Sequence, residues 1–244
     1  MRYQSKAQEN FAKLEKNSYP GRGIVLGMSP DGSALVQVYW IMGRSENSRN
    51  RVFLLDEKTG FVRTKAFDES KLSDPSLIIY YPARHLANCH IITNGDQTDT
   101  IFEGIKAGKT FEESLESRQY EPDGPNFTPR ISGIFFKNPQ PALYKLSVLK
   151  SADNSEDAGC IRETFAYEKG IPGLGHFVST YLTDGKPIPS FEGVPQWMPV
   201  FDSPEKTLDA YWMALDEANK VSLLVKWIDC KTFAAKTLIV NKLK

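Results

Sequence analysis

The chain has 244 residues, enough to bury the hydrophobic core of one large domain or two small ones. Its 30 basic and 30 acidic residues balance, so no overall charge attracts the protein to nucleic acid or to an anionic membrane. Neither is therefore expected among its partners. Any anion that the protein binds must be held by a local group of arginines.

The cysteines and the first residues both favour a protein of the cytoplasm. Cys89, Cys160 and Cys230 lie far apart, in odd number and without metal-ligand spacing, as in a reduced compartment. Residues 1–17 contain neither the apolar core of a signal peptide nor a membrane span. We expect residues 1–20 to form a helix or an arm that the mature chain keeps.

Short apolar segments separated by turns follow from Gly21 onward. Two β-rich runs, residues 23–28 and 34–41, flank a Pro-Asp-Gly turn and predict a hairpin. Helices are expected at residues 96–117, interrupted at Gly108, and at residues 203–219. Further strands are expected at residues 51–55, 61–66, 77–81, 88–93, 131–136, 143–149, 160–167, 176–182, 221–228 and 233–240.

The order of these elements predicts a single α+β domain at residues 21–244, because no Ser/Gly linker or low-complexity tract divides the chain. Many strands with only two sizeable helical regions favour antiparallel sheets over a parallel one. The sequence has no P-loop, dinucleotide-binding glycine fingerprint, His-Glu-x-x-His or Gly-x-Ser-x-Gly motif. Triphosphate hydrolysis, hydride transfer, zinc proteolysis and α/β-hydrolase chemistry therefore lose support.

Arginines mark two places where a phosphate could bind. Arg44, Arg49 and Arg51 fall within a short polar loop, where guanidinium groups beside hydroxyl donors such as Ser45 suit a phosphate monoester. Arg130 opens a later strand, whose apolar continuation would fix the direction of its side chain. A solvated polar loop without a ligand remains the alternative for the first group.

Residues 89–103 join an apolar strand, an Asn-Gly break and the polar start of a helix, an arrangement in which sites are commonly built. Asp96 and Asp99 have the spacing of a helix cap, and capping alone would also explain them. In a regular helix Asp99 and Glu103 point away from the apolar face. Glu103 can therefore do chemistry only if that far side lines a cleft or the helix is irregular.

Aromatic and imidazole side chains give weaker signals. Tyr80 and Tyr81 follow an apolar run, and strand alternation sends their rings to opposite faces, where either could be an ordinary core tyrosine. His85, His90 and His176 show no ligand spacing. We expect His90, which lies between apolar residues, to be a hydrogen-bonded core histidine rather than a base.

Five short segments of the chain occur in the order seen in the archaeal-type IMP cyclohydrolases. They are residues 19–23, Arg44-Ser45 with Arg51, Ile79-Tyr80, residues 93–103 and residues 128–131, followed by a looser match at residues 175–185. The chain therefore resembles this family, mainly over residues 1–150. The resemblance implies a four-layer αββα sandwich of mainly antiparallel sheets, similar to that of the Ntn hydrolases.

The reaction implied by the resemblance is the last step of de novo purine biosynthesis. In it, 5-formamidoimidazole-4-carboxamide ribonucleotide (FAICAR) closes its ring to inosine monophosphate (IMP) with loss of water, a step that requires no metal or organic cofactor. Tyr80 would then donate a proton to the formyl oxygen, Arg51 would supply positive charge, and Glu103 would orient or deprotonate the carboxamide. The greater length of the arginine loop leaves Arg49 as an alternative to Arg51.

The remaining implications concern binding of the purine nucleotide and assembly. The resemblance implies a homo-oligomer. Two alternatives to catalysis of this reaction stay open: a purine-nucleotide-binding protein without turnover, and another amide-processing enzyme on the same scaffold. The expected substrate-binding residues are Asn94, Gly95, Thr98 and Asp99 for the base and ribose, and Arg22, Arg44, Ser45, Arg49 and Arg130 around the phosphate.

Overall fold

The computed structural model describes residues 2–71, 78–139, 141–155 and 159–244 and shows an α+β protein with two antiparallel sheets. In spatial order, the six-stranded sheet contains β11 (Gln196–Pro199), β10 (Leu174–Ser179), β1 (Gly23–Met28), β2 (Ala34–Met42), β12 (Lys220–Asp229) and β13 (Ala235–Asn241). The seven-stranded sheet contains β3 (Arg51–Asp56), β4 (Phe61–Ala66), β5 (Ala83–Leu86), β6 (Cys89–Thr93), β7 (Arg130–Phe136), β8 (Tyr144–Ser151) and β9 (Cys160–Tyr167).

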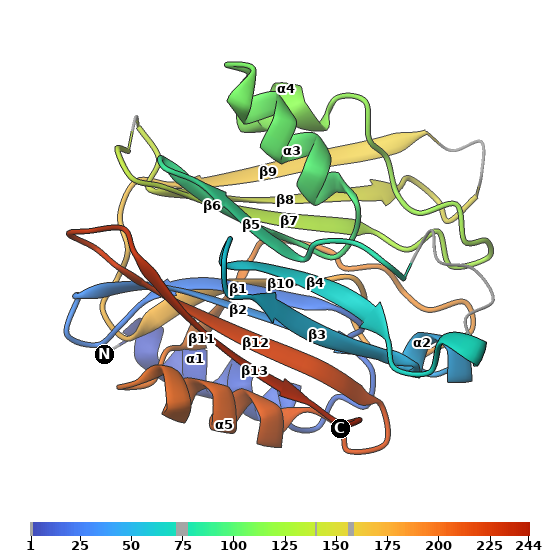
Figure 1. Cartoon of the computed structure of the whole chain (residues 1–244). Helices are drawn as coiled ribbons and strands as arrows, with labels where there is room; N and C mark the ends of the chain where they lie inside the picture. Colours follow the sequence, from blue (N-terminus) through green and yellow to red (C-terminus); the bar gives the residue numbers. More distant parts are fainter. Residues whose placement is uncertain (1, 72–77, 140, 156–158) are drawn as a thin grey trace.

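The two sheets lie face to face, and helices lie against their outer faces (Figure 1). Helices α1 (Arg2–Leu14) and α5 (Pro204–Ala214) lie on the six-stranded sheet. Helices α3 (Gln97–Lys106) and α4 (Phe111–Leu115) lie on the seven-stranded sheet. Among the described residues, no helix has the length and apolar character needed to span a membrane.

Alternation along the central strands explains this packing. In β1, Ile24 and Leu26 point between the sheets, whereas Val25 belongs to the cluster beneath α1 and α5. Both faces of β1 and β2 are buried, because each sheet is covered on two sides. The continuous apolar runs of these strands are the sequence mark of that double burial.

Most of the predicted elements are confirmed, including the β1–β2 hairpin, and local chemistry explains where helices begin and end. Gly108 has a φ of +84° and separates α3 from α4. The Oγ of Ser203 accepts a hydrogen bond from the backbone N–H of Lys206, which begins α5. The helix predicted at residues 203–219 ends early, at Ala214, because Leu215 is extended.

The strand predicted at residues 77–81 is wrong where it can be checked, since residues 78–81 form a bend and Leu77 lies outside the described residues. The backbone N–H of Tyr80 donates to Oγ1 of Thr64, at 2.9 Å, and the N–H of Thr64 donates to the carbonyl of Tyr80. One of the two hydrogen bonds between these residues is therefore made by a side chain and not by the backbone. Four short elements were not predicted: α2 (Glu46–Arg49), the 3-10 helix η1 (Glu69–Lys71), β5 and β11.

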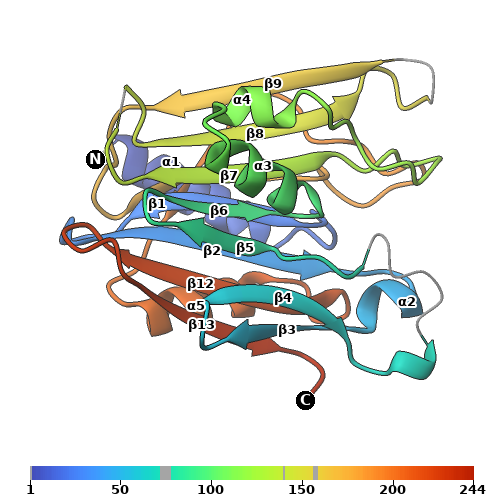
Figure 2. The same ribbon diagram turned by 45° about the horizontal axis from the view of Figure 1, so that its top comes forward.

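One end of the two sheets gathers the segments singled out by their sequence. Strand β1 begins where β2 and β10 end, with Gly23 opposite Trp40 and Ser179, and β6 ends beside the start of β7. We call this the arginine end, because Arg22 precedes β1, Arg51 begins β3 and Arg130 begins β7. Figures 1 and 2 show α2 at this end and the β12–β13 turn at the opposite end.

Candidate active site

Five ionisable side chains are buried close enough to influence one another at the arginine end: Arg22, Arg51, Tyr39, Tyr80 and Glu121. Arg51 is only 1% exposed and Glu121 only 2%. Burial of this many charged or acidic groups is costly unless they compensate one another. Such clusters are candidates for functional sites.

Arg22 immediately precedes β1 and is held there by its backbone. Its N–H donates to Oγ1 of Thr180 at 3.1 Å. Gly21 must be a glycine, because its φ is +71° and a Cβ would lie 2.1 Å from the same Oγ1. Burial opposes the charge of Arg22, but Glu121 and the neighbouring hydroxyl groups of Tyr19, Tyr181 and Tyr80 together outweigh it, and the pKa of Arg22 is raised. Arg22 therefore stays charged.

Arg51 begins β3 and points into the same cluster. Its Nε donates to the carbonyl of Ser48 at 2.9 Å, which fixes the guanidinium plane. Burial and the neighbouring charge of Arg22 lower its pKa. Nη1 of Arg51 and Nε of Arg22 are buried without a hydrogen-bond partner among the described residues. These N–H groups are donors that an anionic or carbonyl ligand could engage.

Tyr80 and Tyr39, which lies on β2, share a hydrogen bond of 2.7 Å between their hydroxyl groups. Burial raises the pKa of both phenols, and the positive charges of Arg51 and Arg22 only partly offset this for Tyr80. Tyr80 is therefore a neutral phenol near pH 7. A neutral phenol beside two arginines can donate a proton or a hydrogen bond to an oxygen that gains negative charge.

Glu121 enters the cluster from the loop between α4 and β7. Its N–H donates to the carbonyl of Thr128 at 2.9 Å, and Nδ2 of Asn94 lies 3.5 Å from its Oε1. Burial raises the pKa of Glu121, although Arg22 and Arg130 act in the opposite direction. A buried carboxyl group with a raised pKa next to cations is suited to proton transfer.

The Asn-Gly turn that follows β6 is packed by internal hydrogen bonds. Oδ1 of Asn94 accepts from the N–H of Ile131 and from Gln97, each at 2.8 Å. The hydroxyl groups of Thr93 and Thr98 lie 2.6 Å apart. At Gly95, a Cβ would lie 2.6 Å from Nη1 of Arg130. Glycine therefore leaves the space that Nη1 of Arg130 occupies beside the turn.

The prediction that Asp96 caps helix α3 is wrong, since its side chain makes no capping hydrogen bond. Its carboxylate instead pairs with Arg118 and with Nη1 of Arg130, the latter at 2.7 Å. Gln97 accepts a second hydrogen bond from Arg130. The cations fix Asp96 more strongly than a single backbone N–H would.

Several residues predicted from the sequence lie outside the buried cluster. The side chain of Glu103 is 62% exposed, and its nearest cation is Lys106, at 3.9 Å. Asp99 pairs with Arg84 at 2.7 Å. Arg44 pairs with Asp184, and Arg49 bonds to the carbonyl of Gly43 and to Asn219. Ser45 caps the short helix α2.

Sequence reasoning did not single out Glu121 or Tyr39. Tyr39 stands inside an apolar strand, and its only sequence signal is a hydroxyl group on an otherwise hydrophobic face. Glu121 opens a loop with two prolines and a glycine, which marks a turn but not a site. Neither residue shares a spacing pattern with Tyr80 or Arg51.

The described residues contain no group of three or more His, Cys, Asp or Glu side chains arranged to hold a metal ion. The groups that are present at the arginine end can supply positive charge, a neutral phenol and a carboxyl group. This set can stabilise an oxyanion and move protons.

Comparison with known proteins gives two kinds of match. The model of a protein family described as IMP cyclohydrolase-like protein matches residues 19–232. The IMP cyclohydrolase of Methanopyrus kandleri is 32% identical over 120 residues, which cover 48% of this chain and 58% of that protein. The IMP cyclohydrolase of Methanococcus maripaludis is 33% identical over 125 residues, covering 49% and 59%. The chain thus spans somewhat more than half the length of these relatives.

Proposed function

The chain belongs to the family of IMP cyclohydrolase-like proteins, and from this we propose that it closes the ring of FAICAR to form IMP, with loss of water. The observation that carries the proposal is the buried group of Arg22, Arg51, Tyr80 and Glu121. A formamide carbonyl that gains negative charge, and an amide nitrogen that loses a proton, need such groups.

The proposed reaction joins two groups of one molecule. The carboxamide nitrogen attacks the formyl carbon, gives up a proton, and the formyl oxygen accepts one, which leaves a cyclic carbinolamine. Loss of the proton of the formamido nitrogen and of that hydroxyl group as water then forms the ring C=N bond, while the former carboxamide nitrogen keeps its second hydrogen. Because the reactants are already tethered, the protein has to select the conformer in which the nitrogen faces the carbonyl.

We assign the oxygen side of this reaction to Tyr80, with Arg51 and Arg22 beside it. Tyr80 donates a proton to the formyl oxygen, and its bond to Tyr39, at 2.7 Å, fixes the direction of the hydroxyl group. Nη1 of Arg51, which has no hydrogen-bond partner in the described part of the chain, supports a role in stabilising the oxyanion. Arg49, whose guanidinium bonds to Gly43 and Asn219, is the less suitable of the two loop arginines.

We assign the nitrogen side to Glu121 in place of Glu103. The burial of Glu121 raises its pKa, which makes it a stronger base toward an amide N–H than an ordinary carboxylate. Glu103 is mostly exposed and lies 3.9 Å from Lys106, which makes it less suitable for this role than the buried Glu121. The role that the family resemblance implies for Glu103 is therefore assigned to Glu121, which lies 18 positions later in the sequence.

The nucleotide is proposed to enter between the polar turn after β6 and the arginine loop. Asn94, Gly95 and Thr98 form the wall for the base and ribose, with Asp99 at its outer edge. Cζ of Arg44 lies 5.0 Å from the centre of the Tyr19 ring, and about a third of the side chain is exposed. Its guanidinium group can therefore contact a phosphate at the outer edge of the site. The other proposed phosphate ligands are Arg22, Ser45, Arg49 and Arg130.

The layering of the fold, the extent of the domain, the oligomeric state and the cellular compartment are also proposals. We propose that residues 21–244 form one domain of the four-layer αββα kind, similar to the Ntn hydrolases, preceded by the helical segment at residues 1–20. The two sheets with helices against their outer faces support this. We further propose a cytoplasmic homo-oligomer, in keeping with three free cysteines, and light scattering would measure its mass.

A turnover assay tests the proposal. Purified protein is mixed with FAICAR without added metal or cofactor, and the ultraviolet absorbance of the purine ring is followed while IMP is identified chromatographically. We expect IMP to form faster than without protein. Binding of IMP without turnover would instead identify a nucleotide-binding protein. Release of ammonia from other amides, with FAICAR unchanged, would identify a different amide-processing enzyme.

A further inference from the structure

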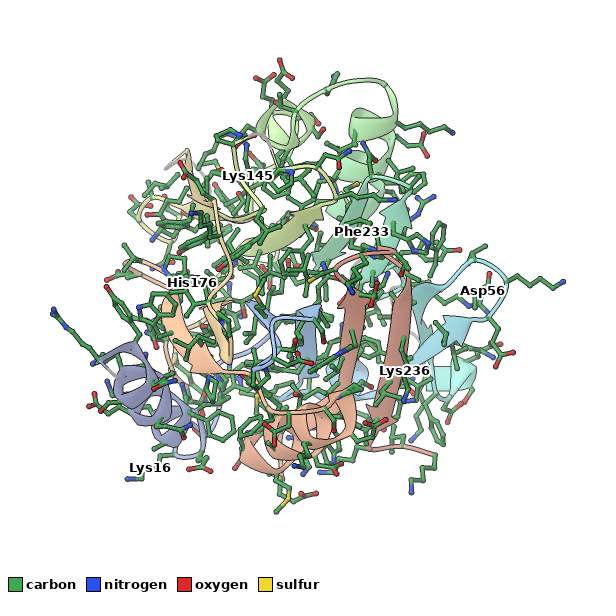
Figure 3. All side chains as sticks on the ribbon, turned by 90° about the vertical axis from the view of Figure 1, so that its left-hand side faces the viewer. Lys16, Asp56, Lys145, His176, Phe233 and Lys236 are labelled. Carbon is green, nitrogen blue, oxygen red and sulfur yellow. The ribbon has the colours of Figure 1, made fainter. Side chains whose placement is uncertain are left out.

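A second group of polar side chains lies between the sheets at the end opposite to the arginines. It borders a cavity of about 460 Å³ that is lined by His85, His90, Lys226 and Phe233, together with small and polar residues of β13 and of the β3–β4 turn. Figure 3 looks onto this end of the molecule, where Phe233 lies at the turn before β13 and Lys236 lies on that strand. We call this space the lysine cavity.

Lys226 is buried in the inter-sheet core, at 1% exposure, although it carries an amine. It stands on β12 directly opposite Gln37 of β2. Its one hydrogen-bond contact among the described residues joins Nζ to Nδ1 of His85, at 3.4 Å. No carboxylate of the described residues forms an ion pair with it. A buried amine without a counter-charge is disfavoured in its protonated form.

The two histidines beside Lys226 are neutral, so neither offers a negative charge that would stabilise a lysine ammonium group. Their rings are stacked 5.1 Å apart, and burial lowers the pKa of His85 to about 4 and that of His90 to about 2. Nε2 of His90 lies 3.1 Å from the carbonyl of Phe233, so the proton sits on Nε2. Nδ1 of His90 and Oε1 of Gln37 are buried without hydrogen-bond partners among the described residues.

These neighbours together make Lys226 unusual among the lysines of the chain. Burial lowers the pKa of its amine to about 7, so a large share of the molecules hold the free amine at neutral pH. Free amines, unlike ammonium groups, attack carbonyl carbons. Nδ1 of His85 is within reach to accept the proton that the attacking nitrogen releases.

We propose that the lysine cavity binds a small aldehyde and that Nζ of Lys226 forms an imine with it. The nitrogen attacks the carbonyl carbon, a C–N bond forms, and a proton moves from nitrogen to oxygen, which yields a carbinolamine. The hydroxyl group then leaves as water, with a second proton from nitrogen, and the C=N bond forms. No electron is gained or lost, so the step needs no further reactant.

The lining favours this ligand class over a phosphate compound. Lys226 is the one buried cation among the described residues that line the cavity, and the exposed Glu57 and Lys58, of opposite charge, also line it. The other lining groups include the apolar Leu55, Ala235 and the ring of Phe233, with the hydroxyl groups of Thr59 and Thr237. A phosphate would need several charged or N–H donors at once. The burial of Lys226 limits the access of bulk water to its amine, which favours the dehydration that completes an imine.

Reductive trapping tests this inference without reference to the proposed function. The full chain is incubated at pH 7 with propionaldehyde and sodium cyanoborohydride, which reduces an imine to a stable secondary amine, and peptide mass spectrometry measures the rate at each lysine. An ordinary lysine is uncharged in only about one molecule in a thousand at this pH. We therefore expect Lys226 to be alkylated at least about tenfold faster than the exposed Lys236.

Two variants test whether the fast alkylation takes place in the lysine cavity. Lys226→Met removes the amine while keeping an apolar stem of similar length, and the fast adduct should disappear. Ala235→Phe places a ring at an exposed position of the cavity lining, leaves Lys226 intact, and should slow its alkylation at least about fivefold through steric block. Equal labelling of Lys226 and Lys236 would overturn the inference. So would an Ala235→Phe protein that is labelled at the wild-type rate.

Discussion

The two ends of the inter-sheet core bury cations in opposite ways. At the arginine end, Glu121 and the tyrosines around Arg22 together outweigh the effect of burial and raise the pKa of Arg22. At the lysine cavity, the neighbours of Lys226 are neutral imidazoles, and burial lowers its pKa to about 7. One fold therefore keeps a charge where a counter-charge is buried with it and discharges an amine where none is.

Removal of the positive charge of Arg22, which leaves the buried Glu121 without its main partner, should have the largest effect on stability. In Arg22→Met, Glu121 loses the strongest of the positive charges that act on it. We expect the free energy of unfolding to fall by about 3 kcal/mol at pH 7, as when one member of a buried charged pair is removed. Urea denaturation followed by circular dichroism measures this.

The same experiment needs a second variant and a control. The double variant Arg22→Met with Glu121→Gln should recover part of the loss, because no uncompensated carboxyl group remains. Arg49→Met, at an exposed arginine of the same end, should change stability by less than about 1 kcal/mol. An Arg22→Met protein as stable as the wild type would show that the two charges do not compensate each other.

At the lysine cavity the opposite variant should stabilise the protein. The pKa of Lys226 is about 7 when folded and near 10.5 when unfolded, so the unfolded chain binds more protons between these pH values. Wild-type stability should therefore rise with pH across this window, and Lys226→Met should lack that contribution. At and below pH 7, we expect the variant to be more stable by about 2–3 kcal/mol after relaxation is allowed for.

Thermal and urea unfolding between pH 6 and pH 10 measure the difference between the two proteins. The comparison with Lys236→Met, an exposed lysine paired with Glu205, separates the burial effect from the loss of any lysine. Curves for wild type and Lys226→Met that stay parallel over the whole range would show that Lys226 keeps an ordinary pKa in the folded protein.

The sequence predicted the sheets well because strand alternation is a local property. The β1–β2 hairpin and β4, at residues 61–66, were predicted correctly from apolar runs and turns alone. The segment around Tyr80 was predicted as a strand for the same reason. The backbone N–H of Tyr80 instead donates to the side-chain Oγ1 of Thr64, and a hydrogen bond of this kind leaves no periodic pattern in the sequence.

The candidate site was only partly predictable, because its members meet through long-range packing. Arg22, Arg51 and Tyr80 were identified by resemblance to a family, whereas Glu121 reaches the cluster from an irregular loop that no spacing rule places. The lysine cavity was missed entirely. His85 and His90 face each other across a hairpin, but Lys226 joins them from a strand 136 positions after His90.

A smaller effect is expected from Tyr80→Phe, which tests the oxygen side of the proposed reaction. The variant keeps the ring and loses the hydroxyl group that bonds to Tyr39. We expect the rate of IMP formation to fall about a hundredfold, equivalent to about 2.7 kcal/mol of transition-state stabilisation. Tyr81→Phe, whose ring packs against Phe61 outside the cluster, should keep nearly full activity. Equal activity of both variants would remove Tyr80 from the mechanism.

The smallest effect is expected at the outer edge of the proposed wall. Asp99 is half-exposed and pairs with Arg84, so Asp99→Asn should change stability by less than about 1 kcal/mol. Its KM for FAICAR should rise no more than about threefold, because water can replace a rim contact. Steady-state kinetics check this. A loss of activity as large as that of Tyr80→Phe would move the site outward from the buried cluster.

The most direct test of the proposed active site compares two carboxylates in one turnover assay with FAICAR. Glu121→Gln keeps the shape of the side chain but removes its basicity, and the rate of IMP formation should fall about a thousandfold. Glu103→Gln, at an exposed position beside Lys106, should remain within about twofold of wild type. Full activity in Glu121→Gln, or loss of activity only in Glu103→Gln, would contradict the placement of the active site in the buried arginine cluster.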